Sequence, residues 1–97
     1  MEKHWAFDID DESKLAFRII TLPHHFRFSI TYIYDKGDDM MALVRIDNFP
    51  HDGTNRTHIH RWRDSCVEYR DMDIKEAEET IIKIGNFIKE RMKNDTY

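Results

Sequence analysis

The chain has 97 residues, of which 40% are hydrophobic and 35% are charged, with a net charge of −4. This composition suits one folded domain over residues 1–97, and it excludes a disordered chain and a wholly basic nucleic-acid-binding protein. No apolar run approaches the roughly 18 residues of a membrane-spanning helix, and no signal peptide is visible. The one cysteine, Cys66, excludes an internal disulfide and favours a cytoplasmic protein, and we expect it to be a small buried residue.

Most of the chain has the alternating or β-branched pattern of strands. Strands are predicted over residues 4–10, 14–22, 25–34, 40–47 and 57–62, and residues 65–70 are a further strand or extended chain. A helix follows, with Asp73 as its N-cap and Glu76 completing a capping box. Its apolar stripe is Ile74, Ala77, Ile81, Ile84, Ile88 and Met92. The expected fold is α+β, an antiparallel sheet of about five strands with a C-terminal helix packed on one face.

Reactive side chains concentrate between residues 45 and 60. Alternate residues of a strand share a face, so Arg45 and Asp47 point the same way, and so do His58 and His60. If residues 40–47 and 57–62 form a hairpin, these two pairs meet near its loop, which contains His51. Residues 56–63 add three arginines and no acid, which predicts a local basic spot able to meet a phosphate.

Three chemistries fit this group of residues. Metal-free phosphodiester cleavage uses one imidazole as base, a second as acid and an arginine to stabilise the charge on phosphorus. A metal site would use Asp47, His58 and His60, with His51 as a further ligand. Plain binding would use the arginines to hold an acidic partner or a nucleic-acid backbone.

A structural interpretation competes with all three. The histidines then are exposed polar residues, and Asp47 and Asn48 are turn formers that bond to the backbone. Arg45 and Asp47 in that case form a surface ion pair that contributes little stability.

The central residues resemble the TumE-like toxin family, small prokaryotic toxins of type II toxin–antitoxin modules. The likeness rests on residues 25–32, on the motif Arg45-Ile-Asp47-Asn48-Phe-Pro50-His51 and on His58-Ile-His60. It departs from the family pattern at Ile46, at Phe49 and at residues 56–57, where a proline-histidine pair is usual. The resemblance implies an antitoxin partner with a helix-turn-helix DNA-binding domain.

The leading hypothesis is therefore a cytoplasmic, toxin-like protein that acts on RNA as a metal-independent endoribonuclease without a cofactor. In this hypothesis His51, His58 and His60 supply acid and base, Arg45 contacts phosphate, and Asp47 orients an imidazole or an arginine. The further substrate-binding residues are Asn48, Arg56 and Arg61. The alternatives are a non-catalytic module that binds a protein partner and, third, a protein that binds a divalent metal at His58 and His60.

Overall fold

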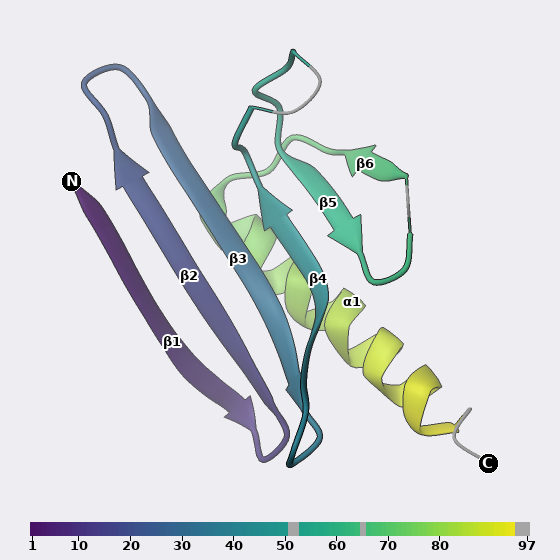
Figure 1. The fold of residues 1–97 in the computed structure, drawn as a ribbon. Helices are drawn as coiled ribbons and strands as arrows, with labels where there is room; N and C mark the ends of the chain where they lie inside the picture. The colour runs from purple at the N-terminus through teal and green to yellow at the C-terminus, as the bar shows by residue number, and fades with distance from the viewer. Residues whose placement is uncertain (51–52, 65, 95–97) are drawn as a thin grey trace.

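The computed structural model describes residues 1–50, 53–64 and 66–94, which form an antiparallel sheet with a helix on one face (Figure 1). The strands follow chain order across the sheet, so each strand pairs with the next. The elements are β1 (Glu2–Asp10), β2 (Ser13–Thr21), β3 (Phe26–Asp35), β4 (Met40–Asp47), β5 (His58–Arg61), β6 (Val67–Tyr69) and α1 (Ile74–Asn94). The predicted α+β class is confirmed, with six described strands instead of about five because residues 67–69 pair with β5.

The core lies between α1 and the middle of the sheet. Alternate residues of β2, β3 and β4 face the helix, and most of these side chains are buried: Leu15, Phe17, Phe28, Ile30, Tyr32, Val44 and Ile46. Gly85 allows α1 to come close, because a Cβ at this position would lie 2.2 Å from Cδ2 of Tyr32. A glycine in the helix interior normally destabilises the helix, and here it permits the contact with the sheet.

The start of α1 follows the predicted capping box. The amide of Glu76 donates to Oδ1 of Asp73 at 2.8 Å, and the Glu76 carboxylate reaches back to the Asp73 amide at 3.5 Å. Further along, the buried line runs through Ala77, Ile81 and Gly85 and then reaches a lysine. The predicted stripe is confirmed: Ala77 and Ile81 are buried in the core, and its other members are partly buried and pack against that core, namely Ile74, Ile84, Ile88 and Met92.

Lys89 is the charged residue on this buried line. Its Nζ donates to Oδ2 of Asp10 at 2.7 Å and to Oγ of Ser13 at 2.8 Å. The hydrogen bond from Lys89 holds the pKa of Asp10 below its ordinary value. Burial disfavours the ammonium ion, but its bonds to Asp10 and its proximity to Tyr32 outweigh this, so the pKa of Lys89 is raised. Lys89 thereby joins α1 to the end of the β1–β2 hairpin.

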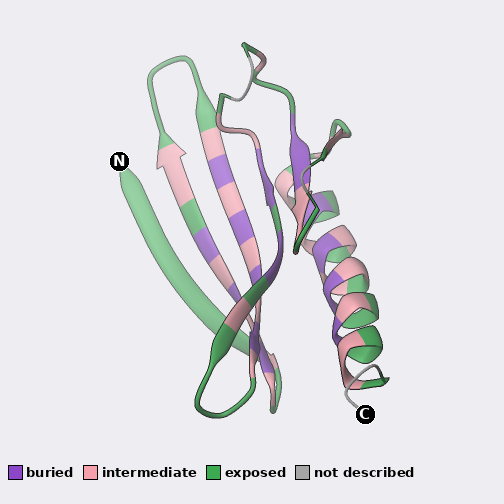
Figure 2. Ribbon diagram, turned by 45° about the vertical axis from the view of Figure 1, so that its right-hand side comes forward, coloured by how far each residue is buried: buried purple, intermediate pink, exposed green. Residues whose placement is uncertain are grey.

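The helix lies over β3 and β4, which leaves the β1 side of the same face uncovered. Almost every residue of β1 is exposed, whereas β2 and β3 contain buried residues (Figure 2). Cys66 is also exposed, which corrects the expectation of a buried thiol. It lies between β5 and β6, where its amide donates to Oδ1 of Asp64 at 2.9 Å. Among the described residues, no helix combines the length and apolar character that crossing a membrane requires.

Candidate functional site

The predicted hairpin of β4 and β5 brings the two reactive pairs together. Asp47 lies opposite His58, and Arg45 lies opposite His60. Their neighbours Ile46 and Ile59 are buried in the core, so by strand alternation the four polar side chains occupy the sheet face away from α1. We call Arg45, Asp47, His58 and His60 the Asp47 group.

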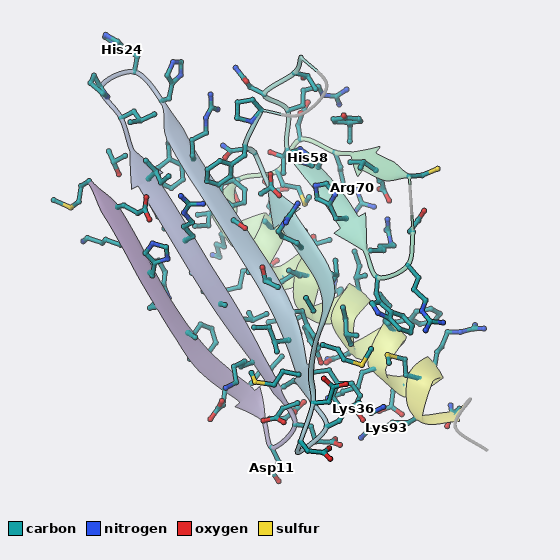
Figure 3. All side chains as sticks on the ribbon, in the orientation of Figure 1. Asp11, His24, Lys36, His58, Arg70 and Lys93 are labelled. Carbon is teal, nitrogen blue, oxygen red and sulfur yellow. The ribbon has the colours of Figure 1, made fainter. Side chains whose placement is uncertain are left out.

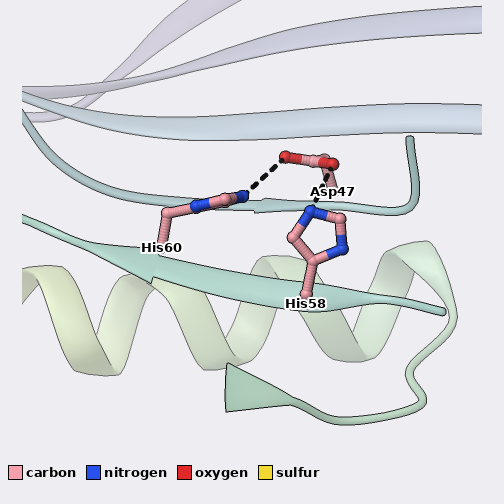
Figure 4. Close-up of side chains that lie close together, drawn as sticks. All are labelled: Asp47, His58 and His60. Carbon is pink, nitrogen blue, oxygen red and sulfur yellow. Dashed lines mark ion pairs between the residues drawn. The ribbon is translucent and has the colours of Figure 1, made fainter. Parts of the chain in front are cut away.

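Asp47 is the centre of this group, and only 3% of its surface is exposed. Oδ1 accepts a hydrogen bond from the amide of Phe49 at 3.0 Å, and Oδ2 accepts one from Nε of Arg45 at 2.9 Å. The imidazoles of His58 and His60 place Nε2 at 3.0 Å and 3.7 Å from the two carboxylate oxygens (Figure 4). Arg45 and Asp47 are therefore not the weak surface ion pair that the structural interpretation expected. Because the carboxylate is buried, loss of a partner would leave its negative charge unpaired and away from water.

His58 has both ring nitrogens beside hydrogen-bond acceptors. Nδ1 lies 2.9 Å from the carbonyl oxygen of Arg56, which can only accept, so Nδ1 carries a hydrogen. Nε2 faces Oδ1 of Asp47, and two lone pairs at 3.0 Å would repel each other. A proton or a cation must therefore lie between Nε2 and the carboxylate.

His60 has more access to solvent than His58. Its side chain is 25% exposed and that of His58 only 2%. The two rings meet edge to face with centroids 4.7 Å apart, and the Tyr69 ring lies 5.7 Å from His58. His58 is thus enclosed at the start of β5 (Figure 3). The His60 ring is partly exposed, but its Nε2 atom, which faces Asp47, is buried.

A pocket of about 220 Å³ opens beside the Asp47 group. Besides that group, its lining residues are Arg18, Ser29, Phe49 and Pro50. Arg18 reaches this pocket from β2. It lies opposite Ser29 of β3, which lies opposite Asp47 of β4, so the three side chains share one face of the sheet. The guanidinium of Arg18 lies 5.2 Å from the centre of the Phe49 ring. Two arginines and two histidines thus line this pocket against one carboxylate.

Sequence reasoning missed Arg18, although it alternates with Phe17 and Ile19, which predicts that it faces away from the core. Its nearest acid is Glu2, whose pKa is lowered by hydrogen bonds from His4 and then from Arg18. Because both Arg18 and Glu2 are substantially exposed, this ion pair contributes little stability, and an anion in the pocket can compete for the guanidinium.

The other predicted residues have different positions. Asn48 bonds to the backbone of β3, accepting from the Phe28 amide and donating to the Phe26 carbonyl, both at 2.8 Å. It therefore fixes the path of the chain after β4. Arg56 pairs with Asp71, Arg61 pairs with Glu68, and neither lines the pocket. His51 lies outside the described residues.

The donor atoms of the Asp47 group also fit a metal ion. One ligand atom each from Asp47, His58 and His60 lies within 4.8 Å of the others. The Nδ1–H of His58 donates to a backbone carbonyl, which is the usual way in which a ligating histidine is oriented. The positive charge of Arg45 beside Asp47 opposes a cation there.

Comparison of the chain with protein-family models, with curated proteins and with solved structures gave no match.

Proposed function

We propose that this protein is the toxin-like component of a prokaryotic toxin–antitoxin module and that it cleaves RNA at the Asp47 group. The observation that carries the proposal is that a buried carboxylate lies beside an arginine and a partly exposed histidine on the wall of one pocket. A guanidinium recognises a phosphate through its N–H groups. Arg45 and Arg18 are thus suited to hold a phosphodiester beside the His60 ring.

His60 is the residue that moves a proton in this proposal. Because Nε2 of His60 is buried and faces Asp47, Nδ1 is the nitrogen that takes the proton of a ribose 2′-hydroxyl. The 2′-oxygen bonds to phosphorus, and the bond from phosphorus to the 5′-oxygen breaks. The leaving oxygen takes a proton from a second acid, the role that we expect for His51. The products are a 2′,3′-cyclic phosphate and a 5′-hydroxyl, and Arg45 stabilises the charge that develops on the phosphoryl oxygens.

His58 has a positioning role in this mechanism. It is enclosed, and its two nitrogens face the Arg56 carbonyl and Asp47, so it fixes the carboxylate rather than exchanging protons with substrate. Asp47 in turn stabilises the imidazolium that forms when His60 accepts a proton. This differs from the acid–base role that the sequence suggested for His58.

The test is cleavage of a defined RNA by purified protein, with the chemical ends of the products identified. We expect cyclic phosphate ends and no cleavage of an oligonucleotide with a 2′-deoxyribose at the cut. His60→Ala should abolish cleavage, and His24→Ala, which changes an exposed histidine on the β2–β3 connection, should retain it. Wild-type protein that leaves RNA intact and growth unaffected would contradict the proposal and favour the non-catalytic module.

A metal-binding function is the second candidate, favoured by the spacing of the three donor atoms and by the Nδ1–H bond of His58. It predicts stoichiometric zinc or another divalent ion in purified protein, lost in His60→Ala, and activity that a chelator removes. Metal-free protein with full activity would exclude this candidate.

The proposed partner is an antitoxin with a helix-turn-helix domain, encoded next to this protein. The resemblance of residues 45–51 to the toxin motif supports it. Co-expression of that neighbour should relieve growth arrest, and the two proteins should copurify. An unrelated neighbouring gene would count against the toxin–antitoxin setting while leaving the RNA assay meaningful.

A further inference from the structure

We propose that two copies of this protein associate through the free edge of β1 and form one continuous antiparallel sheet. β1 pairs with β2 on one side, and no other described strand pairs with it. Trp5 and Phe7 stack on Phe17, at centroid distances of 4.9 Å and 5.6 Å, yet each remains 42% exposed. A long edge strand with an aromatic face is a template for a further strand.

The backbone shows which residues can make this contact. The Met1 amino group donates to the Thr21 carbonyl at 3.0 Å, and the Thr21 amide donates to the Met1 carbonyl at 2.8 Å. In an antiparallel ladder such doubly bonded pairs alternate with non-bonded ones. Odd-numbered residues of β1 therefore bond to β2, and the N–H and C=O groups of Glu2, His4, Ala6 and Asp8 point towards the free edge.

Two-fold symmetry then limits the register. The outward groups of the two copies can hydrogen-bond to each other only if the two-fold axis passes midway between the two copies of one residue. An axis between the two Ala6 residues, called the axis at Ala6, places His4 opposite Asp8 of the second copy. An axis at Trp5 instead opposes Glu2 and Asp8, two carboxylates, which is unfavourable. An axis at Phe7 opposes His4 and Asp10, and an axis at Ala6 also opposes Glu2 and Asp10, but both of these pairs lie across the irregularity between Asp8 and Asp10. Within the regular stretch from Glu2 to Asp8, the register at Ala6 pairs His4 with Asp8 and opposes no two carboxylates, so charge complementarity favours it.

The side chains on the helix side fit the same register. Trp5 of each copy lies opposite Phe7 of the other in a non-hydrogen-bonded pair, where the side chains are closest. Because the two-fold axis is normal to the sheet, both helices lie on the same face of the joined sheet. On that face the Trp5 and Phe7 rings of the two copies form one cluster with the two Phe17 rings. About six backbone hydrogen bonds form at the junction.

The test is to measure the molar mass of the protein by sedimentation while its concentration is varied from roughly micromolar to millimolar. We expect a monomer–dimer equilibrium that Ala6→Pro abolishes and Ala6→Ser retains. Proline removes only the outward N–H at this position, so the bonds between β1 and β2 remain. A wild-type monomer over the whole range, or a dimer that a folded Ala6→Pro protein still forms, would overturn the proposal.

A cysteine cross-link tests the register independently of how Ala6→Pro folds. In a Cys66→Ser background, Ala6→Cys should form a disulfide-linked dimer, because directly opposite Cα atoms lie about 5.5 Å apart. Asp8→Cys is the matched control, since its partner would lie about 13 Å away along the strand. Cross-linking at position 8 and not at position 6 would overturn the register at Ala6.

Discussion

Two groups of buried charge lie on opposite faces of the same sheet. In the Asp47 group, a carboxylate with 3% exposure meets an arginine and two histidines. Under α1, Lys89 is 5% exposed and meets Asp10 and Ser13. Both groups satisfy a buried charge with hydrogen bonds, so burial and pairing alone do not separate a reactive site from a structural one.

The surroundings separate the two groups. The Asp47 group lines a pocket with arginines on its wall. Asp10 and Ser13 also border a hollow, but its lining is largely carboxylates and does not include Lys89. The ammonium of Lys89 joins the helix to the β1–β2 hairpin instead. A cation that faces an open pocket is therefore available for a ligand, whereas a cation beneath a helix stabilises the fold.

The largest expected effect is on activity. His60→Ala should lower RNA cleavage by roughly 10²- to 10⁴-fold, the usual contribution of a general base. The free energy of unfolding should change little, because the His60 ring is partly exposed. Cleavage rate and urea unfolding, measured on the same preparation, check this. An equal loss of stability would instead give His60 a structural role.

Asp47→Asn should affect both properties. The amide cannot match the charged acceptor that Arg45 and His58 have now, and we expect a loss of about 1–3 kcal/mol in the free energy of unfolding. Cleavage should fall as well, because the imidazolium of His60 loses its counter-charge. Asp39→Asn, at an exposed position, is the control. Unchanged unfolding would show that the Asp47 group does not stabilise the fold.

Lys89→Met should lower stability and leave cleavage unchanged. Methionine keeps much of the packing but removes the bonds to Asp10 and Ser13. The expected loss is about 1 kcal/mol, less than for Asp47→Asn, because water still reaches Asp10. Urea unfolding measures it. A large loss of cleavage in a folded variant would remove the distinction between the two groups.

Acid should weaken the Lys89 contact. The pKa of Asp10 is lower in the folded chain than its ordinary value of 3.8, so the contact is fully present above that value. Its stabilisation is lost as the pH falls through the lower folded pKa. Unfolding between about pH 5 and pH 2 should therefore depend less on pH in Lys89→Met than in wild type. Identical pH dependence in the two proteins would contradict the assignment.

Local patterns predicted much of this molecule. Strand alternation predicted that the pair Arg45 and Asp47 would meet the pair His58 and His60 across a hairpin, and the capping box predicted the start of α1. These predictions succeed because the two strands follow one another in the chain and the cap spans four residues.

Long-range features escaped prediction for a physical reason. Arg18 enters the pocket through the registers of three strands, and Lys89 meets Asp10 across 79 residues. Helical periodicity treats a lysine as polar and exposed, so it cannot anticipate a distant carboxylate. The enclosure of His58 depends on Tyr69 in β6, a strand of three residues with little pattern of its own.

The most direct test of the proposed catalytic site is RNA cleavage by wild-type, His60→Ala and Lys89→Met proteins, each verified as folded and compared in one assay. We expect that His60→Ala loses cleavage while Lys89→Met cleaves at the wild-type rate. Equal activity in all three proteins, or loss in Lys89→Met alone, would contradict the assignment of the Asp47 group as the site of the reaction.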